Sequence, residues 1–104
     1  MEILTYEFPA SKTLSRQAHV GVVGSGDLEI LLEPSSEARA KLIVRTGSQG
    51  FEKTWEALLS RFFTQNDFAA NIKINDFGAT PGVVSLRLAQ ALEVSQHHSK
   101  HIKA

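Results

Sequence analysis

Apolar residues in the first half of the chain recur at every second position, which is the period of a half-buried strand. The first such run, residues 3–8, stops at Pro9, and a second run through residues 18–22 stops before Gly24. Two further runs alternate in the same way, with the apolar sets Leu28, Ile30, Leu32 and Ala40, Leu42, Val44. Because short turns separate the last three runs, they predict an antiparallel meander.

The second half of the chain changes period and then changes back. Its aromatic and leucine residues recur at the spacing i, i+4, i+7, i+8, which places one apolar stripe on a helix of about four turns. The stripe consists of Phe51, Trp55, Leu58, Leu59, Phe62 and Phe63. Residues 71–75 (Asn-Ile-Lys-Ile-Asn) alternate again and predict a strand. This half therefore contributes a helix and a strand in that order.

A turn and a second helix are expected after that strand. Asp76-Phe77-Gly78 predicts a tight turn in which Phe77 packs inward and the glycine supplies a special backbone angle. Thr80 is suited to cap the helix and Pro81 to occupy its first position. The apolar face of this helix then consists of Val83, Val84, Leu88, Ala91 and Leu92.

These elements predict an α+β fold, a mostly antiparallel β-sheet with two α-helices packed on one face. Neither an internal repeat nor a linker divides the chain, so residues 1–94 are expected to form a single domain. The remaining residues, 95–104, are rich in histidine and lysine and have little to bury. We expect them to form a frayed C-terminal tail.

Composition narrows the class of protein. The 104 residues carry 11 Lys and Arg against 11 Asp and Glu, interleaved along the chain, which argues against a nucleic-acid partner despite a possible basic stripe at Arg39, Lys41 and Arg45. No apolar run approaches the roughly 20 residues that span a bilayer, and the N-terminus does not resemble a secretory signal. Cysteine is absent. A cytoplasmic protein without a membrane partner or disulfide framework is therefore expected.

One short segment could carry chemistry. Gly24-Ser25-Gly26-Asp27 lies between two predicted strands, and its glycines would leave the Ser25 hydroxyl exposed at the tip of a hairpin. A modifying enzyme needs such access to a serine, although Gly, Ser and Asp are also common in turns for purely conformational reasons. The next candidates are Ser35 and Ser36 beside Pro34, which lack glycine neighbours.

Other patterns do not support a catalytic or metal site. The spacing from Gly21 to Gly26 is GxxGxG and a strand follows it, whereas a dinucleotide-binding loop needs GxGxxG before a helix. Asp76-Phe77-Gly78 spells the magnesium-binding triplet of kinases, yet the other kinase motifs are absent. The histidines His97, His98 and His101 have neither an apolar shell nor a nearby carboxylate, and His19 is remote from them in sequence. We therefore expect no catalytic residues and no metal.

Three segments resemble a known family, the acyl-carrier (delta) subunits of bacterial malonate decarboxylases. They are the opening Met-Glu-Ile-Leu-Thr-Tyr-Glu-Phe-Pro-Ala, the segment 22–29 (Val-Val-Gly-Ser-Gly-Asp-Leu-Glu) and the segment 74–82 (Ile-Asn-Asp-Phe-Gly-Ala-Thr-Pro-Gly). Ser25-Gly26-Asp27 is also distantly similar to the modified turn of the citrate lyase acyl carrier protein. The resemblance covers almost the whole chain apart from the C-terminal tail.

The resemblance implies a covalent prosthetic group on Ser25, namely 2′-(5″-phosphoribosyl)-3′-dephospho-CoA held through a phosphodiester, with Gly24, Gly26 and Asp27 as the flanking turn. A prosthetic-group transferase would install it. Its thiol would be acetylated, exchanged to malonyl by an acyltransferase subunit, and decarboxylated back to acetyl by a two-subunit decarboxylase, so that the chain serves malonate catabolism without catalysing a step. Since the chain has no cysteine, the thiol would have to arrive with the group.

Two alternatives belong to other classes. An unmodified regulatory or assembly module would dock on partner enzymes without any group on Ser25. A stand-alone hydrolase would turn over malonyl thioesters by itself. Ordinary phosphopantetheine carriers are excluded, because they are acidic helical bundles with an Asp-Ser-Leu motif, whereas this chain is neutral, strand-rich and has a valine before Ser85-Leu86.

Overall fold

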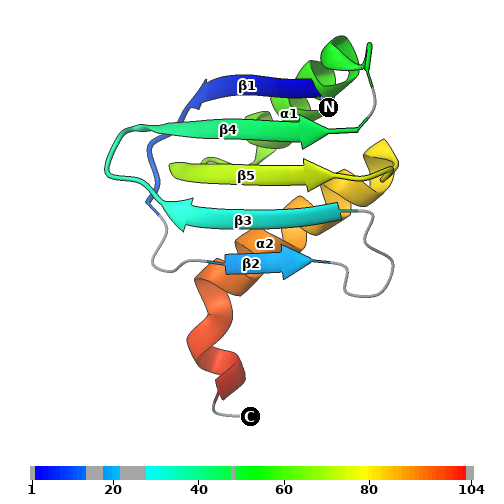
Figure 1. Cartoon of the computed structure of the whole chain (residues 1–104). Coiled ribbons are helices and arrows are strands. Elements are labelled where there is room, and N and C mark those ends of the chain that lie inside the picture. The colour runs from blue at the N-terminus through cyan, green and yellow to red at the C-terminus, as the bar shows by residue number, and fades with distance from the viewer. Residues whose placement is uncertain (1, 14–17, 22–27, 48, 103–104) are drawn as a thin grey trace.

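The computed structural model describes residues 2–13, 18–21, 28–47 and 49–102, with the backbone alone for 18–21 and 96–102. Among these residues a five-stranded sheet has the order β1-β4-β5-β3-β2. Figure 1 shows both helices behind the same face of this sheet, as predicted. The elements are β1 (Glu2–Pro9), β2 (Ala18–Gly21), β3 (Leu28–Pro34), β4 (Arg39–Thr46), α1 (Glu52–Gln65), β5 (Ala70–Asp76) and α2 (Pro81–Ile102).

The strand order corrects the predicted meander. The strands β2 and β3 do pair antiparallel, but β5 lies between β3 and β4, pairing antiparallel with β3 and parallel with β4. The parallel pair is possible because α1 carries the chain back to the starting end of the sheet before β5 begins. The β4 strand instead pairs antiparallel with β1. With one parallel pair among the described strands, the sheet is mostly antiparallel, and the predicted α+β class is confirmed.

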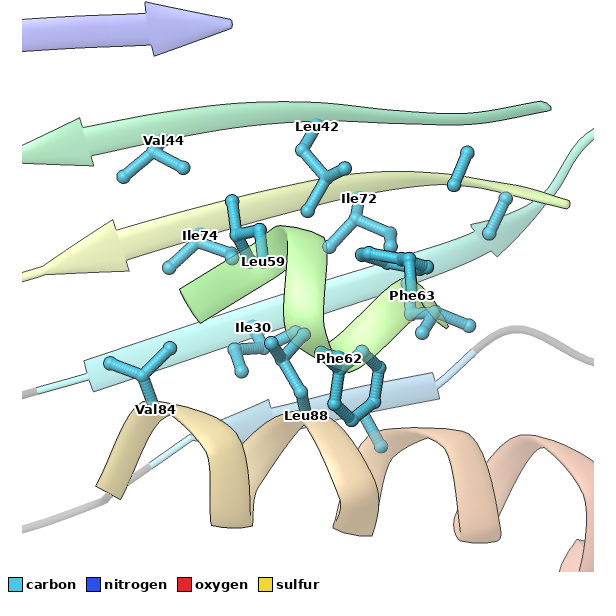
Figure 2. Packing of buried hydrophobic residues seen from close by; sticks show 14 of the residues in the cluster. Ile30, Leu42, Val44, Leu59, Phe62, Phe63, Ile72, Ile74, Val84 and Leu88 are labelled. Atoms are coloured by element: carbon cyan, nitrogen blue, oxygen red, sulfur yellow. The ribbon is translucent and has the colours of Figure 1, made fainter. Parts of the chain in front are cut away.

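The core lies between the inner face of the sheet and the two helices. The alternation predicted for the central strands is confirmed, since every predicted inward residue of β3, β4 and β5 is at most 2% exposed. Figure 2 shows Ile72 and Ile74 of β5 pointing toward Leu59 of α1, with Val84 and Leu88 of α2 closing the cluster. Burial of these side chains at about 25 cal/mol per Å² is the main stabilising contribution of such a core.

The predicted stripe of α1 is confirmed except at its first residue. Trp55, Leu59, Phe62 and Phe63 are buried. Phe51 is 50% exposed, because it is the residue before the helix, with φ −106° and ψ 19°, and its side chain leaves the helical stripe. The first helical hydrogen bond runs from the Trp55 N–H to the Phe51 carbonyl over 3.0 Å. Phe51 therefore remains available at the surface.

An aromatic cluster fills the end of the core where β1 and α1 finish. The rings of Phe8 and Phe63 stack with centroids 5.2 Å apart, and Phe68 lies 5.1 Å from Phe63 and 6.2 Å from Phe62. Such ring pairs contribute about 0.5–1.5 kcal/mol each beyond their buried area. The opposite end of the core, where β5 ends and α2 begins, lacks such a cluster among the described residues.

The second helix begins as predicted and extends further than the predicted domain. The Val83 N–H donates to the Thr80 hydroxyl over 3.4 Å, Pro81 is the first helical residue, and Val84, Leu88 and Ala91 are buried. The helical backbone continues to Ile102. Ser95 is fully buried and its hydroxyl donates to the Leu92 carbonyl over 2.7 Å. Fraying of residues 95–104 stays a prediction.

Candidate functional site

The segment that carries Ser25 joins two paired strands at one end of the sheet. Gly24, Ser25, Gly26 and Asp27 lie outside the described residues. The strands on either side are antiparallel neighbours, with Gly21 opposite Glu29, so the segment 22–27 connects a hairpin, as predicted. β2 is the outermost strand of the sheet, and the hairpin therefore lies at its edge. On its outer side, β2 has no strand neighbour among the described residues.

At the end of the sheet where β3 begins, residues of β3, β5 and β4 lie side by side. Leu28 pairs with Asp76, and Asp76 pairs with Thr46 on the other side. We call this region the Asp76 end. It also includes the start of α2, because only Phe77–Thr80 separate Asp76 from Pro81. Leu28 is the first described residue after the Ser25 segment, and it pairs directly with Asp76 at the Asp76 end.

Asp76 joins two segments of the Asp76 end through hydrogen bonds, the end of β4 and the turn that precedes α2. Its Oδ2 accepts a bond of 2.9 Å from the Thr46 hydroxyl, and its Oδ1 accepts bonds of 3.0 and 2.8 Å from the Gly78 and Ala79 N–H groups. The Asp76 carbonyl accepts a further bond of 3.2 Å from the Gly47 N–H. Asp76 is 5% exposed and Thr46 fully buried, and a buried carboxylate with this many donors is satisfied rather than destabilising.

The turn after Asp76 confirms one prediction and contradicts another. Gly78 has φ +126°, a backbone conformation that side chains disfavour, so it does supply the special angle. Phe77 does not pack inward, since it is 58% exposed. Alternation along β5 places residues 70, 72, 74 and 76 on the inner face, which turns residue 77 outward. The same period could have identified Asp76 as the buried residue.

A cavity of about 200 Å³ opens at the Asp76 end between α1 and the start of α2. Its apolar wall comes mainly from Phe51, Trp55, Leu58, Pro81 and Val84. Thr46, Thr54 and Asp76 are polar residues of the lining. Sequence reasoning placed Trp55 in the core and did not find this cavity, because no local pattern tells how closely two helix starts approach.

The two alternative serines lie at the opposite end of the sheet. Ser35 and Ser36 belong to the connection between the end of β3 and the start of β4. The Ser35 hydroxyl accepts a hydrogen bond of 3.1 Å from the Glu37 N–H, which engages it in its own turn. Ser36 is exposed.

The possible basic stripe on β4 is largely paired. The Arg39 guanidinium lies 2.8 Å from a Glu7 carboxylate oxygen, which raises the pKa of Arg39, and the Lys41 ammonium lies 2.7 Å from Glu37, which lowers the pKa of the Glu37 carboxyl. Arg45 lies four residues beyond Lys41 along β4, on the same outward-facing side. Pairing with interleaved acids weakens the field that a nucleic-acid site needs.

Metal and membrane features can be judged only where the chain is described. Within residues 2–13, 28–47 and 49–95, no three His, Cys, Asp or Glu side chains gather in a way that could hold a metal ion. The side chains of His19, His97, His98 and His101 lie outside the described ones. No helix in the described part of the chain is both long and apolar enough to cross a membrane.

Comparison with known sequences identifies the family. The sequence model of the malonate decarboxylase delta subunit (MdcD) family matches residues 15–95, a range that includes Ser25. The chain belongs to this family. Most of the described sheet, α1, the greater part of α2 and the whole Asp76 end lie within the matched range.

Relatives in the MdcD family match nearly from end to end. The malonate decarboxylase acyl carrier protein of Stutzerimonas stutzeri (strain A1501) is 51% identical over 98 residues, which cover 93% of this chain and 99% of the relative. The protein of the same name from Azotobacter vinelandii is 51% identical over 94 residues, covering 89% and 95% of the two chains.

A solved structure shares the fold. One chain of a Pseudomonas malonate decarboxylase hetero-tetramer, crystallised in complex with malonate, is 48% identical to this chain with a TM-score of 0.82. The match covers 89% of this chain and 97% of that one. The resemblance stated from the sequence is thereby confirmed at the level of the family.

Proposed function

We propose that this chain is the acyl carrier subunit of a malonate decarboxylase and that Ser25 carries its prosthetic group. The observation that supports this most directly is membership of the MdcD family over a range that contains Ser25. The group proposed is 2′-(5″-phosphoribosyl)-3′-dephospho-CoA, attached through a phosphodiester to the Ser25 hydroxyl. When attached, it supplies a thiol, which a chain without cysteine cannot provide.

The described residues around the segment suit such an attachment. The Ser25 segment connects a hairpin at the edge of the sheet, with Gly21 opposite Glu29 at its base. Glycines on both sides of Ser25 remove side-chain bulk beside the proposed linkage. On the far side of the hairpin base, Leu28 is held by pairing with Asp76, whose hydrogen bonds fix this end of the sheet. The attachment point would therefore lie three residues from a strand whose position is fixed by pairing and hydrogen bonds.

The catalytic steps belong, in this proposal, to partner subunits in the cytoplasm. A transferase installs the group, an acyltransferase subunit loads it, and a two-subunit decarboxylase releases carbon dioxide. The chain's own contribution is to tether one thiol near several active sites, which raises its effective concentration to the millimolar range for a short flexible linker. The hetero-tetrameric assembly of the solved relative supports a multi-subunit setting.

An unmodified assembly module is the second candidate, and the open face of the sheet favours it. Both described helices lie on one face (Figure 1), and the other face exposes Ile3 at 60% and Ile43 at 40%. A surface of this kind can dock on a partner without any modification. A carrier must also dock, however, so this surface does not separate the two functions.

The decisive experiment replaces Ser25 in the assembled complex. We expect Ser25→Ala to fold with unchanged thermal stability, to gain no mass on incubation with the prosthetic-group transferase and its substrate, and to reduce malonate decarboxylation by the complex to background. Ser36→Ala is the matched control, because Ser36 is an exposed serine at the opposite end of the sheet. It should gain the adduct mass and retain full activity.

Mass mapping distinguishes the outcomes. An adduct on the peptide containing Ser25 supports the carrier function. Full decarboxylation by the Ser25→Ala complex would refute it and leave the assembly module in its place. Turnover of malonyl thioesters by the isolated chain would instead support the alternative that the chain is a stand-alone hydrolase.

A further inference from the structure

We propose that the cavity at the Asp76 end binds the adenine ring of the prosthetic group, and this inference rests on the proposed function. The cavity measures about 200 Å³, less than the roughly 300–1,000 Å³ of pockets that enclose a drug-sized ligand. It can therefore admit one ring system and cannot enclose the whole group. Adenine is the one flat, uncharged ring that the group contains.

The lining of the cavity suits an adenine ring. Trp55 and Phe51 offer aromatic surface, and stacking of a base on an aromatic side chain is worth about five-fold or more in affinity. Leu58, Pro81 and Val84 add apolar contact. Thr54 and Asp76 are polar lining residues whose side chains carry hydrogen-bond acceptors, a chemistry that suits the exocyclic amino group. The carboxylate also disfavours the phosphates, so the ring is the part of the group that fits.

Chain connectivity places the cavity within reach of Ser25. An extended chain spans at most about 3.6 Å per residue, so the Ser25 Cα lies within about 11 Å of the Leu28 Cα. Leu28 pairs with Asp76, which lines the cavity. In the proposed group only a phosphate and two ribose units separate the serine oxygen from adenine. The ring lies near the attached end of the group and the thiol lies at the other end.

Binding the ring would shape how the thiol moves. With adenine held at the Asp76 end, the portion between the phosphates and the thiol remains free and swings from a fixed point. A tethered ligand experiences a local concentration of millimolar order, so even millimolar affinity keeps the ring bound for much of the time. The site therefore needs no tight binding of free nucleosides.

The single tryptophan of the chain makes the cavity directly observable. Trp55 is the one tryptophan of the sequence, so its indole N–H gives one unambiguous cross-peak in a ¹H–¹⁵N spectrum. In the unmodified chain, we expect adenosine to shift this peak in a saturable manner with a millimolar dissociation constant. Ribose, which lacks the ring, should leave it in place. In the modified chain, the peak should already lie near the adenosine-saturated position.

Two variants and a matched control test the location. Phe51→Leu keeps an apolar side chain but removes an aromatic wall at a 50% exposed position, and should weaken adenosine binding at least about five-fold. Ala79→Leu adds bulk at a half-buried cavity residue and should abolish the shift. Ala89→Leu makes the same change at an exposed position of α2 and should bind adenosine normally.

The outcomes separate this inference from the function on which it rests. If intact mass shows the adduct while the Trp55 peak stays at its unmodified position, the inference is wrong and the carrier function stands. The inference is also wrong if adenosine up to about 10 mM leaves the peak unmoved, since that exceeds the effective concentration of a short tether. If no adduct forms on the Ser25 peptide, the proposed function fails and this inference fails with it.

Discussion

Replacing Thr46 by valine tests whether the hydrogen bond to Asp76 holds the Asp76 end together. Valine keeps the shape of threonine and removes the hydroxyl that donates to Asp76 Oδ2 over 2.9 Å. A hydrogen bond to a charged group contributes about 1.5–3 kcal/mol, and loss of one donor to a buried carboxylate adds a desolvation cost. Asp76 keeps the two N–H donors of the following turn, so that added cost is partial. We therefore expect Thr46→Val to lower the free energy of unfolding by about 2 kcal/mol.

Chemical and thermal unfolding give the measurement. At about 5 °C per kcal/mol for a domain of this size, the expected loss corresponds to a fall in Tm of about 10 °C. Thr54→Val is the control, because Thr54 lines the same cavity but is exposed on α1. That change should stay within about 0.5 kcal/mol.

A double-mutant cycle assigns the loss to the pair. If the Thr46 hydroxyl acts through the Asp76 carboxylate, Thr46→Val should cost less in an Asp76→Asn background, with a coupling energy of about 1 kcal/mol. A loss for Thr46→Val no larger than that for Thr54→Val would refute the reasoning. Full additivity in the cycle would place the effect of Thr46 elsewhere in the core.

Two further perturbations test the turn and the long-range contacts. Gly78→Ala should destabilise the chain by about 1–3 kcal/mol, because Gly78 has φ +126°. The control Gly82→Ala, in α2, should be neutral or stabilising. Equal effects of the two changes on the free energy of unfolding in urea would contradict this reasoning. The hydrogen bonds from the Ser11 hydroxyl and N–H lower the pKa of Asp67 below its usual value of 3.8. The stability that this contact adds is therefore present above pH 3.8 and is lost as the pH falls through the lower pKa of the folded state. Asp67→Asn should therefore flatten the acid side of the stability profile, and an unchanged profile from pH 5 to 2 would exclude the contact.

Local patterns predicted most elements, because the determining signal lies within each segment. Alternation in β3, β4 and β5 identified the inward residues, since the pleat itself forces that period. The Thr80-Pro81 start of α2 depends on one side chain and one ring, and both act within a single turn. The errors at Phe51 and Phe77 each concern a residue just outside a regular element, where the period no longer applies.

Strand order could not be predicted in the same way. The residues of β4 alternate identically whether the strand borders β3 or β5, because alternation specifies faces and not neighbours. The same distinction between local sequence and tertiary arrangement applies to the candidate site. The glycine-flanked serine is a local feature that the sequence displays, whereas the cavity depends on α1 and α2 starting at the same end of the sheet.

The insertion of β5 between β3 and β4 determines what the Ser25 hairpin is attached to. In a simple meander, β3 would border β4 and Leu28 would have no direct link to the turn that begins α2. With β5 in between, Leu28 pairs with Asp76, and Asp76 bonds to the Gly78 and Ala79 N–H groups immediately before that helix. A change in the cavity between α1 and α2 can therefore reach the base of the hairpin through one residue. On this argument Asp76→Asn should shift the Leu28 amide resonance as well as that of Trp55, and a shift confined to either residue would show that the hairpin base and the cavity are independent.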